Sequence, residues 1–322
     1  DAQESRGLGD VYKRQDKNLL IHFPCGNAGG SMHTYLRAIG FRECKNRQQL
    51  EDIYRHTLNT PNRKIMTTIS VDTSLLQFEK DFGRNFGLSL VGEYDIKGSL
   101  SIEHYFPYLK GDRFMQFENI TIQKQTDKES YAGVCEDYHL GMTIIFYVIN
   151  IADYAKSKWL NYSNRQITKV KFSALSVAGT VLLGMHHSKH QIAVESKGRN
   201  RRNQLLDAAR NGDTDAMEQL TYDEMNTYTS ISSRVIKEDV LSIIDTSFMP
   251  CGVECDHYMV IGNIYAVEKL QNIYSKEIVY NLLIEANGLM INVGINEADL
   301  QGEPKVGRRF RGEIWLQGVV TI

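Results

Sequence analysis

The chain has 322 residues, of which 42% are hydrophobic, and carries 37 basic and 39 acidic side chains for a formal net charge of −2. This is the composition of a globular chain rather than a disordered one, and the length suffices for one large or two ordinary domains. Near-neutral charge argues against whole-protein attraction to nucleic acid or acidic lipid.

The first 31 residues differ in character from the rest. Ser5–Gln15 reads SRGLGDVYKRQ, which resembles a translated sequencing adapter. The codons for Ala28–Ser31 could contain a bacterial ribosome-binding site at the usual distance before Met32. The apolar run before Cys25 is too short for a signal peptide. We therefore expect residues 1–31 to make few core contacts, as an artificial leader or as a natural disordered extension.

Helical signals follow Met32. His33–Gly40 is expected to be helical, with Gly40 in the left-handed conformation that ends a helix. Asn46 and Gln49 have capping-box spacing and predict a second helix that Pro61 closes.

The clearest hairpin joins Gly87–Asp95 to Ser99–Phe106. A three-residue loop would set Asp95 opposite Ser99 and Leu90 opposite His104, which keeps apolar residues on one face.

Further elements follow in the first half of the chain. Met142–Ile149 is apolar on both alternating faces, which suits a central strand or a short buried helix. Ile151–Trp159 is compatible with a helix. Lys169–Leu183 is interpreted as a second hairpin that turns near Ser176–Gly179.

Composition changes at Glu195, and Asn203–Tyr228 predicts helices that resemble one ankyrin-type hairpin, with Gly212 at the turn and Asp213 starting the second helix. Thr221–Glu224 has capping-box spacing for a further start. Because no second copy is present, we interpret this stretch as a connector.

Strands dominate the C-terminal part. The predicted strands are Val240–Met249, His257–Leu270, Glu277–Glu285, Leu289–Ile295 and Arg308–Ile322, with a turn at Asn287–Gly288 and one helical turn at Asn296–Leu300. This order suits a small β-barrel-like, OB-like domain and also other small sheets. The predicted class is α+β with mainly antiparallel sheets, divided into a leader (1–31), an α+β domain (32–195), a helical connector (196–236) and a β-rich domain (237–322).

Three stretches resemble an uncharacterised family of clostridial proteins, a domain of unknown function. They are MHTYLRAIGF from Met32, IIDTSFMPCGVECDHY from Ile243 and GEPKVGRRFRGEIWLQG from Gly302. The resemblance covers Met32 to the C-terminus and supports a start at Met32. It implies no activity and no catalytic residues.

Two groups of residues are weak candidates for metal ligands. Cys251, Cys255 and His257 have the spacing of a zinc half-site, but a second ligand pair is missing, and free cysteines are commonly small buried apolar residues. His186 and His190 would share one helix face, yet the segment is expected to end a strand in a solvated loop. We therefore predict no metal and no cofactor.

The strongest binding signal lies near the C-terminus. On a strand, Arg309, Arg311 and Trp315 share one face, and Lys305 adds charge. Two cations beside an aromatic ring suit single-stranded nucleic acid, whereas the alternative is a solvated edge whose arginine stems cover apolar surface.

The leading hypothesis is a non-enzymatic interaction protein, because no convergent catalytic set or phosphate-binding loop is recognised. The expected partner is another protein or a single-stranded nucleic acid. The alternative is a metal-dependent hydrolase that uses histidines of the first domain. Four scattered cysteines after Met32 and no apolar run of about 20 residues favour a cytoplasmic protein without a membrane partner.

Overall fold

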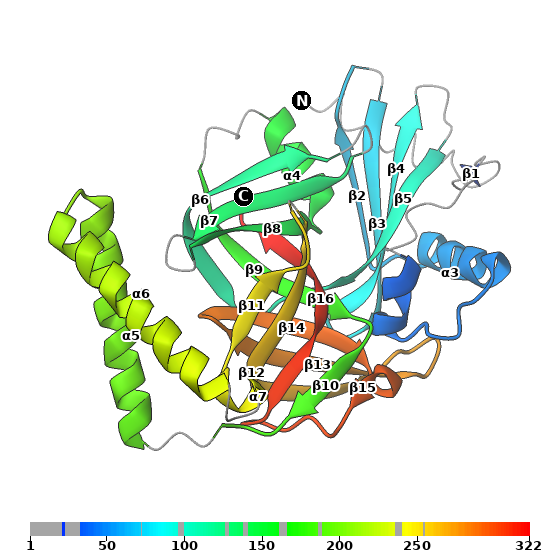
Figure 1. Ribbon diagram of the computed structural model, residues 1–322. Coiled ribbons are helices and arrows are strands. Elements are labelled where there is room, and N and C mark those ends of the chain that lie inside the picture. Colours follow the sequence, from blue (N-terminus) through cyan, green and yellow to red (C-terminus); the bar gives the residue numbers. More distant parts are fainter. Residues whose placement is uncertain are drawn as a thin grey trace.

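The computed structural model describes residues 21–22, 33–71, 73–95, 100–125, 129–137, 141–160, 166–185, 189–235, 240–253 and 255–322. Figure 1 shows two sheets, two helices next to the first sheet, and a helical hairpin outside both sheets. The protein is α+β, as predicted. The described segments contain no helix long and apolar enough to cross a membrane.

Sheet A has the order β1-β5-β4-β3-β2. Its strands are β1 (Ile21–His22), β2 (Arg63–Thr68), β3 (Thr73–Gly83), β4 (Phe86–Asp95) and β5 (Leu100–Leu109). All pairs are antiparallel except β1 with β5. Most of the predicted leader lies outside the described residues, so the expectation for residues 1–31 stays a prediction.

The predicted β4–β5 register is correct only near the turn. Tyr94 pairs with Leu100 as expected, but Leu90 pairs with Tyr105 instead of His104. A bulge between Val91 and Gly92 shifts the register by one residue. A side chain at Gly92 would collide with the Ser101 carbonyl oxygen, 2.4 Å from the ideal Cβ position, so the bulge depends on glycine.

The N-terminal helices confirm the local predictions. A 3-10 helix, η1 (Tyr35–Ile39), ends at Gly40 with φ +88°. Helix α3 (Arg47–Asn59) starts with the complete Asn46–Gln49 capping box. It buries Ile53 and Tyr54 against sheet A, where the Tyr54 and Tyr105 rings lie 4.9 Å apart.

Sheet B closes on itself. Its strands are β6 (Phe114–Lys124), β7 (Tyr131–Asp137), β8 (Met142–Val148), β9 (Ile167–Ser176), β10 (Gly179–Leu182), β11 (Ser247–Pro250), β12 (His257–Gln271), β13 (Ile278–Ala286), β14 (Leu289–Asn296), β15 (Leu300–Gln301) and β16 (Arg309–Val320). The strands β12, β13, β14, β9 and β16 form a ring, since β16 pairs with both β9 and β12. Strands β6, β7 and β8 close a second ring on β9 and β16.

The ring contains β9, which precedes the predicted connector. A self-contained C-terminal OB-like domain is therefore not confirmed, and sheet B crosses the predicted boundary near residue 196. The two-residue turn at Asn287–Gly288 is confirmed, because both residues have positive φ and Ala286 pairs with Leu289. The helical turn η3 (Glu297–Asp299) is also confirmed.

The predicted hairpin at Lys169–Leu183 is wrong. Both β9 and β10 pair antiparallel with β16, at Ala174↔Leu316 and Gly179↔Gly312, so they lie end to end along the same strand. The bend between them adds one residue relative to β16. The Ser176 hydroxyl lies 2.7 Å from the Glu313 carbonyl oxygen and 3.0 Å from that of Ala178, so it can donate its single proton to either carbonyl at the bend.

Aromatic side chains hold the sheets together. The rings of Phe106 on β5 and Tyr147 on β8 lie 5.0 Å apart, and Phe146 meets Phe172 at 5.3 Å within sheet B. All four side chains are fully buried. For Met142–Ile149 the sequence allowed a central strand or a buried helix, and the structure has strand β8 there. Helix α4 (Ile151–Trp159) has the predicted bounds.

Two long helices, α5 (Lys189–Arg210) and α6 (Thr214–Val235), occupy the predicted connector (196–236), and α5 already begins before residue 196. Gly212 has φ +92°, and the Asp213 carboxylate accepts from the Ala216 backbone amide, so the predicted turn is confirmed. Thr221 does not start a helix; its hydroxyl donates to the Met217 carbonyl inside α6.

The predicted strand Val240–Met249 is correct only at its end, from Ser247. This stretch contains a short helix, α7 (Val240–Ile243), followed by β11. The carbonyls of Leu241 and Ile244 turn toward Arg309 and accept its hydrogen bonds. A distant arginine therefore satisfies groups that a strand would have paired with a neighbouring strand.

Candidate functional site

The predicted nucleic-acid face on β16 is divided between the interior and the surface. Arg309 is 5% exposed, and its guanidinium donates to the carbonyl oxygens of Leu183 (3.0 Å), Ile244 (2.6 Å) and Leu241 (2.9 Å). These bonds join β16 to two other segments. Arg309 thus acts as an internal clamp in this structure.

Trp315 is also buried. Its indole N–H donates to the Asp256 carboxylate at 2.7 Å, and its ring lies 5.2 Å from the rings of Tyr35 and Tyr147. A nucleobase therefore cannot stack on this ring. Of the four predicted residues, Arg311 and Lys305 are exposed, and the Lys305 ammonium lies 2.7 Å from the Glu303 carboxylate.

Cys251, Cys255 and His257 lie close together at the hairpin between β11 and β12. The Cys251 amide donates to the His257 carbonyl, and the Cys255 thiol donates to the same oxygen at 3.3 Å. His257 Nδ1 lies 2.9 Å from the Asp256 carboxylate, and this bond raises the pKa of His257. Burial raises the pKa of the Cys251 thiol.

In the part of the chain that the structure describes, no group of three or more His, Cys, Asp or Glu side chains is arranged to hold a metal ion. His186 lies outside the described residues, and so does the side chain of His190. The backbone of His190 belongs to α5, so the expected loop is wrong at this residue. The metal-dependent alternative therefore stays a prediction.

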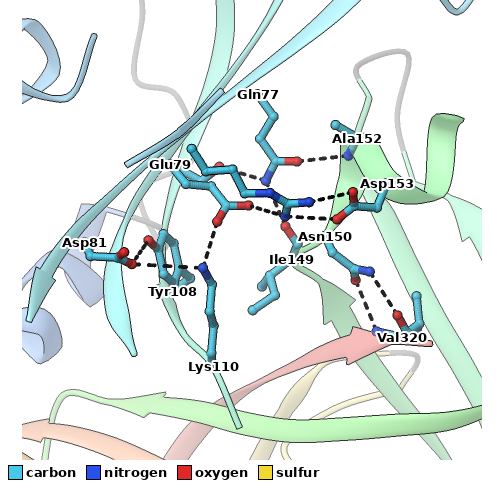
Figure 2. Close-up of polar contacts among 12 residues, drawn as sticks. Gln77, Glu79, Asp81, Tyr108, Lys110, Ile149, Asn150, Ala152, Asp153 and Val320 are labelled. Carbon is cyan, nitrogen blue, oxygen red and sulfur yellow. Dashed lines mark hydrogen bonds and ion pairs between the residues drawn. The ribbon is translucent and has the colours of Figure 1, made fainter. Parts of the chain in front are cut away.

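A network of charged side chains, which the sequence patterns did not single out, lies between sheet A and α4 (Figure 2). Glu79 on β3 is 3% exposed, and its carboxylate lies 2.8 Å from the Lys110 ammonium and 3.4 Å from the Arg63 guanidinium. Arg63 also forms a two-pronged pair with Asp153 on α4, at 2.8 and 3.0 Å.

The same face of β3 carries Asp81, whose carboxylate accepts from the Tyr108 hydroxyl at 2.6 Å. Burial raises the pKa of Tyr108 well above its usual value. The alternation of Gln77, Glu79 and Asp81 is a sequence signal for this polar face. Ion pairs occupy this face, and they hold sheet A and α4 together.

Gln77 supplies the neutral part of the network (Figure 2). Its side-chain amide donates to the Ile149 carbonyl at 2.9 Å and accepts from the Ala152 amide at 2.9 Å. Asn150 similarly exchanges two hydrogen bonds with the Val320 backbone. These amides connect sheet A, α4 and the end of β16, so they fix how the layers meet.

Among the described residues, a group of exposed apolar side chains lies on α6. Four of its Met and Tyr side chains are 46–76% exposed: Met217, Tyr222, Met225 and Tyr228. At 100° per residue they fall within roughly 140° of the helix circumference. The α5–α6 hairpin lies at the left of Figure 1, outside the sheets, and the Arg210–Glu118 ion pair joins it to β6.

The fold and these surfaces define an α+β protein with a closed sheet and a helical arm. Comparison with family models matches residues 36–318 to the family described as "Domain of unknown function, E. rectale Gene description (DUF3881)". The chain belongs to this family, in agreement with the resemblance of the three stretches. Comparisons with curated proteins and with solved structures found no match.

Proposed function

We propose that the chain is a non-enzymatic interaction protein that assembles through its α5–α6 hairpin. The observation that carries this proposal is the exposed Met and Tyr face of α6. Met side chains adapt to a partner surface, and Tyr contributes apolar area together with a polar end. An exposed apolar face of this kind is typical of an interaction site.

The charges of the hairpin favour a second copy of the chain as the partner. Helix α5 contains six basic and two acidic residues, whereas α6 contains four acidic and one basic residue. Within one hairpin, Arg202 on α5 lies 3.5 Å from Glu224 on α6. In a two-fold dimer, α6 of each protomer would meet the basic α5 of the other.

The nucleic-acid form of the hypothesis has less support. Only Arg311 and Lys305 of the predicted set are exposed, and Lys305 already pairs with Glu303. The hairpin offers a larger apolar surface and complementary charges of both signs. Four free cysteines in the described residues are compatible with the proposed cytoplasmic location.

The test is the molar mass in solution across protein concentration and salt. The Met225→Ser/Tyr228→Ser variant removes two central apolar side chains and adds no charge. We expect the wild type to form a dimer that weakens as ionic strength rises. The variant should raise the dimer dissociation constant at least about tenfold, since tenfold is 1.4 kcal/mol and two buried side chains contribute more than that.

Tyr265→Ser is the matched control, because Tyr265 is 58% exposed and lies on β12, which is not part of the hairpin. It should dimerise like the wild type. A monomer at every concentration, or equal dimerisation by all three proteins, would contradict the proposal. Circular dichroism of each variant confirms that the helices persist.

A further inference from the structure

A cavity of about 430 Å³ lies where α4 meets the two sheets. Its lining residues come from the end of β2, from β6 and β7 and from the last turns of α4: Thr68, Ile69, Lys124, Glu129, Tyr131, Ala155, Lys158 and Trp159. Cavities that bind small molecules usually measure about 300–1,000 Å³ and lie between structural layers. No residue of the α5–α6 hairpin lines it.

One of the residues that line the cavity is Lys124, whose side chain is 41% exposed and whose ammonium group is held by an ion pair. Lys124 Nζ lies 2.6 Å from Glu129 Oε1, and the Tyr131 hydroxyl donates to the other oxygen of the same carboxylate. Glu129 and Tyr131 are 7% and 4% exposed. Because an ammonium has three donors and Glu129 takes one, Lys124 keeps two donors in a position that buried neighbours determine.

Helix α4 adds a second cation and an aromatic side chain to the lining. Trp159 is 48% exposed, and Lys158 is exposed one residue before it. Within the described part of the chain Lys158 has no ion pair. The lining therefore carries two ammonium groups against one carboxylate, which is already bound by Lys124 and Tyr131. The excess positive charge disfavours a cationic ligand.

We propose that this cavity binds a small aromatic anion, whose ring packs on Trp159 and whose carboxylate, sulfonate or phosphate group contacts Lys124 and Lys158. The proposal goes beyond self-assembly and uses other elements of the fold. An indole face provides stacking area, and the two ammonium groups provide charge-assisted hydrogen bonds. Glu129 and Tyr131 act as positioning residues, since they hold Lys124.

The probe is 8-anilinonaphthalene-1-sulfonate, an aromatic sulfonate whose fluorescence rises on binding. We expect one saturable site per chain, with energy transfer from Trp159 to the probe. Lys158→Ala should weaken binding roughly tenfold, the effect of losing about 1.4 kcal/mol. Trp159→Ala should weaken it at least as much, whereas Trp159→Phe keeps a ring and most of the affinity. Rising salt should also weaken binding.

Lys156→Ala is the matched control, because Lys156 is an exposed lysine of the same helix that does not line the cavity. It should bind the probe like the wild type. Competition with benzoate and with phenyl phosphate distinguishes a carboxylate from a phosphate ligand, and displacement by either supports the site.

Three results would overturn the proposal. Equal probe binding by Lys158→Ala, Trp159→Ala and the control would place the probe elsewhere. Loss of binding in Met225→Ser/Tyr228→Ser would assign the signal to α6 instead. Displacement by neither competitor, nor by benzenesulfonate, would exclude a small aromatic anion as the ligand. Because the hairpin variant is measured separately, failure of this site and failure of the proposed assembly remain distinguishable.

Discussion

Replacing Arg309 with alanine tests whether this residue is an internal clamp or a ligand-binding side chain. Arg309 is 5% exposed, and its guanidinium donates to three backbone carbonyls, which belong to Leu183, Leu241 and Ile244. Arg311, two residues along the same strand, is exposed. Arg311→Ala is therefore the matched control.

The magnitude follows from the three hydrogen bonds. A hydrogen bond to a charged group contributes about 1.5–3 kcal/mol, and loss of one partner leaves a buried acceptor unsatisfied. The contributions are not additive, and water can reach part of the vacated space. We therefore expect Arg309→Ala to lower the free energy of unfolding by roughly 3–5 kcal/mol. Arg311→Ala should change it by less than about 0.5 kcal/mol.

Urea unfolding followed by circular dichroism measures both values. Arg309→Lys should recover only part of the loss, because an ammonium lacks the planar fork that reaches three carbonyls. A loss below about 1 kcal/mol for Arg309→Ala, or equal losses for Arg309→Ala and Arg311→Ala, would refute the clamp. Single-stranded oligonucleotide binding is best tested with Arg311→Ala, since its effect is free of a change in stability.

Two further predictions concern the layer contacts and pH. Gln77→Leu leaves the Ile149 carbonyl and Ala152 amide without their buried partner and should cost about 2–4 kcal/mol in a urea titration; an unchanged midpoint would show that the amide is dispensable. The bond to Asp256 raises the pKa of His257, so its stabilisation is full below the free value near 6.5 and is lost as pH rises through the folded value. Asp256→Asn should therefore cost more stability at pH 5.5 than at pH 8, and a pH-independent cost would contradict this assignment.

Short-range features were determined by the sequence itself. The Asn46–Gln49 capping box, the left-handed Gly40, the helix Ile151–Trp159 and the Asn287–Gly288 turn all occur as predicted. Each depends on hydrogen bonds or backbone preferences within a few residues. Such signals do not require knowledge of the neighbours in space.

Only the tertiary structure decided which surfaces are covered. Alternation along β16 predicted that Arg309 and Trp315 share a face, but it did not reveal that distant segments bury both. The partners of Arg309 lie 65–126 residues away, and Asp256 lies 59 residues from Trp315. The bend that places β9 and β10 along one strand likewise depends on β16. A strand pattern specifies two faces, whereas the chain that packs against each face is specified only when remote segments meet.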